Sequence, residues 1–150
     1  MYSVFNPQTS ATLADRIESL STDHQAQWGK MSPWQMVRHC IKSERMFQGE
    51  KAYKRTFVGR LFGKMALKGI LKDESPMDRN QPTHPEFKIT GDGDLTVAKE
   101  TWHDLVRSYA SLPAESFVDF VHPFFGKMTY DEIGKYVYKH TDHHLRQFGV

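Results

Sequence analysis

TYDEIGKYVYKHTDHHLRQFGV, residues 129–150, is the stretch that decides the fold class of this chain. It opens with Thr129, followed three residues later by Glu132. This spacing is a capping box, in which the hydroxyl and the carboxylate each satisfy a free backbone amide at the start of a helix. The stretch therefore predicts a helix that begins near Tyr130 and carries the three histidines that follow.

Helical spacing sorts the histidines of this stretch onto different faces. The stripe with the apolar residues consists of Ile133, Val137, His140, His144 and Phe148. His143 lies on another face, among charged and polar residues. We therefore expect His140 and His144 to point into the protein and His143 to point elsewhere.

Two histidines four residues apart on one helix can bind the same divalent ion. Zinc peptidases of the HExxH type use this spacing, but Thr141 occupies the position of their glutamate. The general base of that chemistry is missing, which argues against a peptidase. The alternative explanation for His140 and His144 is two polar residues near the C-terminal end of a helix, where cations interact favourably with the helix dipole.

Three further segments combine a cap with apolar residues at helical spacing. They predict helices at 7–20 after Asn6, at 33–48 after Ser32, and from Asp94 to about Ala110. Between the last two, residues 73–94 carry three prolines and two glycines and predict an irregular crossover. Together with the helix near Tyr130, these segments predict an all-α fold.

His39 lies on the apolar face of the predicted helix 33–48. Its neighbours on this face are Met36, Cys40, Ser43 and Phe47. A histidine in such a place is often hydrogen-bonded to a neighbouring protein group. With an inward pair of histidines on another helix, a third metal ligand becomes the better explanation for His39.

Residues 51–72, KAYKRTFVGRLFGKMALKGILK, contain seven basic residues and no acidic one. The favoured interpretation is a long connection in which Phe57, Leu61 and Met65 cover the domain and the lysines are solvated. Three glycines weaken any continuous helix here. The alternative is a surface for anionic lipid or nucleic acid.

Composition indicates one globular domain, residues 1–150. Hydrophobic residues make up 39% of the chain and charged residues 25%, and the net charge of +2 is too balanced to favour a nucleic-acid partner. Cys40 is the only cysteine, so no internal disulfide forms. No leader-like N-terminus and no integral membrane segment are apparent, so a cytoplasmic location is expected.

Two motifs carry a resemblance to a known family: SPWQMVRHC at 32–40 and KHTDHHLRQFG at 139–149. With a histidine on the second helix and a His-x-x-x-His pair on the last, the chain resembles the DinB-like superfamily of metalloproteins. The basic stretch and the crossover match this family only loosely. The resemblance implies a four-helix bundle with a long crossover between helices 2 and 3. It also implies a divalent ion, zinc or nickel, bound by His39, His140 and His144.

Characterised members of that superfamily include bacillithiol transferases and a mycothiol-dependent isomerase. The resemblance therefore implies a metal-dependent enzyme that transfers a low-molecular-weight thiol to an electrophilic small molecule. A metal-dependent hydrolase and a non-catalytic metal-binding or interaction domain stay open as alternatives. Relatives often form homodimers, which makes a homodimer a candidate assembly.

Spacing assigns no catalytic or thiol-binding residue, because a general base must be placed by three-dimensional geometry. Five residues are candidates for positions around the metal or in a pocket. They are Asn80, His84, His122, Tyr136 and Asp142.

Overall fold

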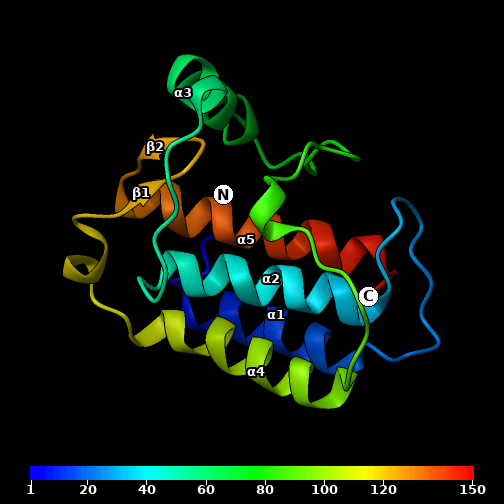
Figure 1. The fold of residues 1–150 in the computed structure, drawn as a ribbon. Helices are drawn as coiled ribbons and strands as arrows, with labels where there is room; N and C mark the ends of the chain where they lie inside the picture. The colour runs from blue at the N-terminus through cyan, green and yellow to red at the C-terminus, as the bar shows by residue number, and fades with distance from the viewer.

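Five α-helices dominate the computed structural model, which describes residues 1–150 (Figure 1). They are α1 (Pro7–Ser19), α2 (Pro33–Phe47), α3 (Phe57–Ile70), α4 (Leu95–Ser108) and α5 (Tyr130–Gln147). Short 3₁₀ helices lie at Pro85–Phe87, Tyr109–Ser111 and Ala114–Phe117, and the two-residue strands β1 (Val121–His122) and β2 (Gly126–Lys127) pair antiparallel. The prediction of a mostly helical fold is confirmed.

The helices begin where the capping residues place them. The Asn6 side chain accepts from two amides of the first turn of α1, and capping boxes are complete at Ser32 and Thr129. Asp94 caps α4 through hydrogen bonds to two amides. Each cap satisfies amides that have no partner within the helix, so these four starts follow from local sequence.

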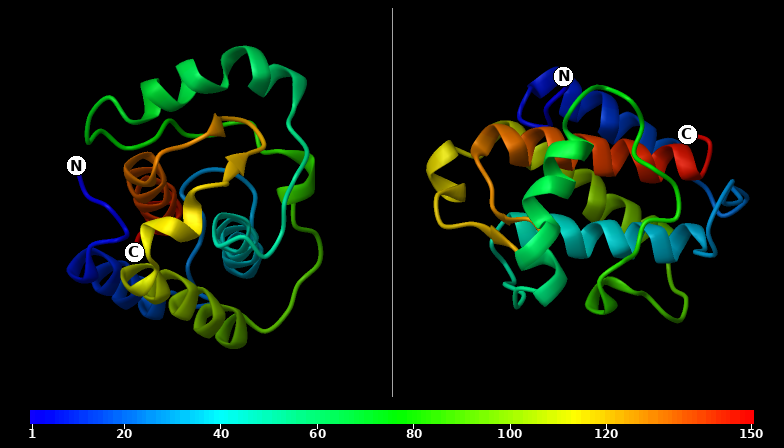
Figure 2. Two further views of the ribbon diagram at one scale, coloured as in Figure 1. Left: turned by 90° about the vertical axis from the view of Figure 1, so that its left-hand side faces the viewer. Right: turned by 90° about the horizontal axis from the view of Figure 1, so that it is seen from above.

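Helices α1, α2, α4 and α5 pack around one shared core, with α4 against both α1 and α2 (Figures 1 and 2). Large side chains from different helices fill this core. The largest fully buried ones include Trp102, Tyr109, Phe47, Phe148, Leu13 and Ile133. Burial of this apolar surface is the main stabilising contribution, and it places α2 beside α5.

Within residues 51–72, Phe57–Ile70 form α3 in place of the predicted long connection, so the prediction of a connection without a continuous helix was wrong. Thr56 caps α3, and the inner face of the helix is made by Gly59 and Gly63, whose small size lets it approach the backbone of Phe124. A Cβ atom at either glycine would collide with the Phe124 carbonyl. The glycines that weaken a helix in isolation are thus needed for close packing in the folded protein.

Three apolar residues of α3 that were predicted to face the domain face the solvent instead. Phe57, Leu61 and Met65 do not cover the domain: they are 76%, 62% and 68% exposed. The helix lies outside the other four, above β1 and β2 (Figure 1). Neither α3 nor any other helix has the length and apolar composition needed to cross a membrane.

The core also encloses a carboxylate, Glu44 of α2. It accepts hydrogen bonds from the hydroxyl groups of Tyr109 at 2.7 Å and Thr141 at 3.4 Å, and no ion pair of the protein includes it. Burial raises the pKa of Glu44 from 4.5 to about 7, although the hydrogen bonds, first of all from Tyr109, oppose this rise. Transfer of a charged carboxylate into the core is costly, so the protonated form of Glu44 predominates in the folded protein below about pH 7.

Candidate metal centre

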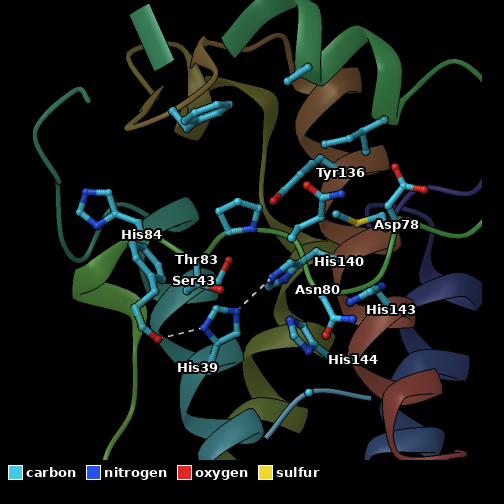
Figure 3. Close-up of a pocket in the computed structure, with 18 of the residues that line it drawn as sticks. His39, Ser43, Asp78, Asn80, Thr83, His84, Tyr136, His140, His143 and His144 are labelled. Atoms are coloured by element: carbon cyan, nitrogen blue, oxygen red, sulfur yellow. Dashed lines mark hydrogen bonds between the residues drawn. The ribbon is translucent and has the colours of Figure 1, made fainter. Parts of the chain in front are cut away.

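Three histidines meet between α2 and α5. His39 comes from α2, His140 and His144 come from α5, and one ring nitrogen of each lies within 4.8 Å of the others (Figure 3). All three side chains are buried, and the Nε2 atoms of His39 and His140 are 3.3 Å apart. The packing of α2 against α5 therefore brings together the three residues that helical spacing selected.

The His39 ring is oriented by the backbone of the crossover. Its Nδ1 lies 3.0 Å from the carbonyl oxygen of Phe87. Because a carbonyl can only accept, Nδ1 carries the proton and donates it, which leaves the lone pair of Nε2 directed towards the other two histidines.

Gln147 orients the His144 ring in the same way. The Nδ1 atom of His144 lies 2.9 Å from Oε1 of Gln147, and the amide nitrogen of Gln147 donates to the Trp28 carbonyl at 2.8 Å. The second hydrogen bond fixes which end of the amide faces the histidine. His144 therefore donates through Nδ1 and, like His39, presents an unprotonated Nε2 to the site.

The third ring, His140, is held by an aromatic neighbour. The Tyr136 ring lies one helical turn before it, with a centroid separation of 5.8 Å and an interplanar angle of 15°. This stacking restricts rotation of the imidazole. Each of the three rings thus has one contact that sets its direction.

Burial keeps the three imidazoles neutral. It lowers the pKa of His39, and it lowers the pKa values of His140 and His144 well below 6.5, with further lowering from the neighbouring histidines. A divalent ion binds the neutral form of imidazole. The environment therefore favours the protonation state that metal binding requires.

The geometry suits one divalent ion. Two imidazole nitrogens bound at about 2.0–2.1 Å in a tetrahedral arrangement lie about 3.4 Å apart, close to the 3.3 Å between His39 and His140. The group of potential ligands contains three residues, whereas a closed structural zinc site has four. A bound ion would therefore keep a coordination position for a small molecule.

A cavity of about 740 Å³ opens from the three histidines (Figure 3). Its walls come from the crossover, the β1–β2 segment and the inner face of α3, so they combine apolar groups such as Ile70 and Phe125 with polar Asn80 and Thr83. Asn80 has a left-handed backbone conformation, with φ of 58°. Asparagine adopts this conformation more readily than most residues other than glycine, and here it occurs in a turn.

Four of the five predicted neighbours of the site line this cavity: Asn80, His84, His122 and Tyr136. Asp142 does not. Its carboxylate pairs with Arg16 and Arg146, each at 2.7 Å, and so ties α5 to α1. Helical spacing could not distinguish a residue that lines the cavity from one that forms ion pairs outside it.

His122 stabilises the turn between β1 and β2. Its Nδ1 accepts hydrogen bonds from the amides of Phe124 and Phe125, both at 3.1 Å. Burial, and next the charge of Arg55, lowers the pKa of His122 to about 3. The ring therefore stays neutral at neutral pH, as an acceptor of two hydrogen bonds.

His143, expected on another face, is half-buried and lies in the cavity wall near Trp28. It is not part of the group formed by His39, His140 and His144. The prediction separated His143 from the inward pair correctly, but the crossover covers it more than expected.

Sequence reasoning missed the two groups that orient the histidines. The Phe87 carbonyl belongs to the backbone of the crossover and gives no sequence signal. Gln147, however, lies three residues after His144, a spacing at which side chains meet on a helix. That spacing was a usable signal.

Replacing Gln147 with leucine should weaken metal binding about 10–100-fold, the usual effect of losing a partner that orients a metal ligand. Gln147→Glu retains an acceptor for His144 and should retain most of the affinity. Gln8→Leu, on the exposed side of α1, serves as the control. Competition with a chromogenic chelator measures the three affinities, and equal values for Gln147→Leu and Gln8→Leu would contradict the prediction.

Comparison with known protein families returned a match. The family model of the DinB superfamily matches residues 6–148, nearly the whole chain. Neither the search of curated proteins nor the search of solved structures returned a significant match. The matched range includes α1 to α5 and all three histidines. The chain is therefore a member of the DinB superfamily.

Proposed function

We propose that this protein is a divalent-metal-dependent enzyme that transfers a low-molecular-weight thiol to an electrophilic small molecule. One observation carries the proposal: three neutral, oriented imidazoles converge at a cavity of about 740 Å³, in a group with three potential ligands. This space accommodates a small substrate beside the histidines. In this proposal α1, α2, α4 and α5 are the four helices of the family bundle.

His39, His140 and His144 would hold the ion, and zinc or nickel suits three imidazole ligands. When bound, such an ion supplies a Lewis acid that favours the deprotonated, nucleophilic form of a thiol. The chain contributes the orientation of the ligands through the Phe87 carbonyl and Gln147. The protein thus prepares the site before any substrate enters.

The cavity wall supports the same function. Apolar side chains such as Ile70 and Phe125 line part of the wall, while Asn80 and Thr83 offer hydrogen bonds to the polar part of a ligand. A mixed wall of this kind favours a small molecule with both apolar and polar groups.

The test uses protein loaded with Co²⁺, whose absorption spectrum reports thiolate coordination. Addition of small thiols such as glutathione and cysteine should produce a sulfur-to-metal charge-transfer band, and a fluorogenic electrophile should be consumed faster than by thiol alone. His39→Ala should show neither effect. An unchanged spectrum together with hydrolysis of p-nitrophenyl acetate would contradict thiol transfer and indicate a hydrolase.

A further inference from the structure

Helix α3 exposes an unusual amount of apolar surface. Phe57, Val58, Leu61, Phe62 and Met65 are each more than half exposed, with values from 51% to 76%. Single exposed apolar residues are common, but five on one short helix form a contiguous patch, which indicates an interaction surface. We call these five side chains the α3 apolar face.

The outward direction of this face follows from how α3 packs. Gly59, Gly63 and Leu67 form the buried face of the helix, and the two glycines lie against the Phe124 backbone. Rotation of the helix to bury its aromatic residues would place larger side chains where only glycine fits. The α3 apolar face is therefore held outside the domain.

Cationic residues follow one edge of the α3 apolar face. At 3.6 residues per turn, Arg60 and Lys64 lie between the buried side and the apolar side of the helix, and Lys68 continues their row to the C-terminal end of the apolar face; all three are exposed. Residues 51–72 contain seven basic residues and no acidic one, whereas the whole chain has a net charge of only +2. The positive charge of the chain is thus concentrated around α3.

This charge argues against a second copy of the same chain as the occupant. Pairing of two α3 helices through their apolar faces would bring two wholly basic segments together, and like charges at close range repel. Lysine is also depleted in protein–protein interfaces. A partner that offers both apolar groups and negative charge suits the apolar face and its cationic edge together.

The shape of this region favours a lipid surface. Helix α3 lies along the top edge of the molecule in Figure 1 and in the left view of Figure 2, outside the other helices, so its length can contact a plane. An apolar face bordered by lysine and arginine is the pattern of helices that lie within the interface of an anionic bilayer. We propose that α3 binds the surface of an anionic membrane, with the α3 apolar face at the acyl boundary and Arg60 and Lys68 at the level of the phosphates.

Co-sedimentation of the full chain with lipid vesicles tests this proposal. The protein should pellet with equimolar phosphatidylcholine and phosphatidylglycerol, bind phosphatidylcholine alone at least about tenfold more weakly, and dissociate as salt is raised. The pair Leu61→Ser and Met65→Ser should bind about 100-fold more weakly, because two large apolar contacts are lost. Circular dichroism checks that the helices of this variant remain.

The cationic edge needs its own variant. Arg60→Gln with Lys68→Gln should bind anionic vesicles about 30-fold more weakly, which corresponds to two cations near the surface. Lys64 is left in place because its ammonium group donates to the Lys127 carbonyl and lies 3.7 Å from Glu132. Matched controls lie on α4: Val97→Ser, where the side chain is 59% exposed, and Arg107→Gln should bind as the wild type does.

Four results would overturn the proposal. The first is wild-type protein that stays in the supernatant with anionic vesicles, and the second is equal binding by the Leu61→Ser and Met65→Ser pair. The third is a wild-type dimer in analytical ultracentrifugation that this pair converts to a monomer, since a second copy would then occupy α3. The fourth is binding to soluble heparin that is as tight as binding to vesicles and is unaffected by the Leu61→Ser and Met65→Ser pair. Charge alone would then explain the binding.

Discussion

Replacing His140 with alanine should abolish stable metal binding. His140 supplies one of three ring nitrogens that lie within 4.8 Å of each other, and its loss leaves two ligands on one side of an ion. We expect the affinity for zinc or nickel to fall at least about 100-fold, more than after the loss of an orienting partner. Elemental analysis of purified protein measures the metal content directly, and added metal should raise the melting temperature of the wild type only.

His143→Ala is the matched control for this experiment. His143 lies on the same helix and in the same cavity wall, but outside the group of three. This variant should bind metal as the wild type does. Equal metal content in wild-type protein and His140→Ala, whether zero or stoichiometric, would rule out the proposed metal site and the proposed enzyme with it. The membrane proposal for α3 is independent of this outcome.

Replacing Glu44 with glutamine should reduce the loss of stability that the protein undergoes as the pH rises from 4.5 to 7. The pKa of Glu44 is about 7 in the folded protein against 4.5 in the unfolded chain. Between these values the unfolded chain releases the proton and the folded protein keeps it, so the free energy of unfolding falls as pH rises through this window. Glutamine does not titrate. The variant should therefore gain on the order of 3 kcal/mol over the wild type between pH 4.5 and 7.

Urea denaturation at pH 4.5 and pH 8, in the presence of a chelator, measures this difference. Other groups titrate equally in both proteins, so their contributions cancel in the comparison. Glu100→Gln, on the exposed side of α4, should leave the pH dependence of stability unchanged. A constant difference between Glu44→Gln and the wild type at the two pH values would contradict a raised pKa for Glu44.

Helix α3 connects the two proposed surfaces of the molecule. Ala66 and Ile70 line the cavity beside the histidines, and Phe57, Leu61 and Met65 are exposed on the outside, while Val58, 55% exposed, borders both surfaces. A single helix of 14 residues thus forms part of the cavity wall and the whole α3 apolar face. A change in the position of α3 would alter both.

Local sequence was sufficient to predict four of the helices. Asn6, Ser32, Asp94 and Thr129 each satisfy amides within three residues, so the start of each helix is a short-range property. The facing of His39, His140 and His144 followed from helical periodicity, and the structure brings their nitrogens together. Their role as metal ligands stays a prediction until metal is measured.

Only the tertiary structure decided the rest, because it depends on atoms distant in sequence. The glycines of α3 predict a weak helix from sequence alone, but in the fold they allow close packing against the Phe124 backbone. The Phe87 carbonyl, which orients His39, is 48 positions away in the chain. The sequence around Glu44 does not predict its burial, since its neighbours Tyr109 and Thr141 come from other segments. Helix starts and helix faces are determined by neighbouring residues in the chain, whereas close packing, desolvation and ring orientation are determined by whichever groups the fold places next to them.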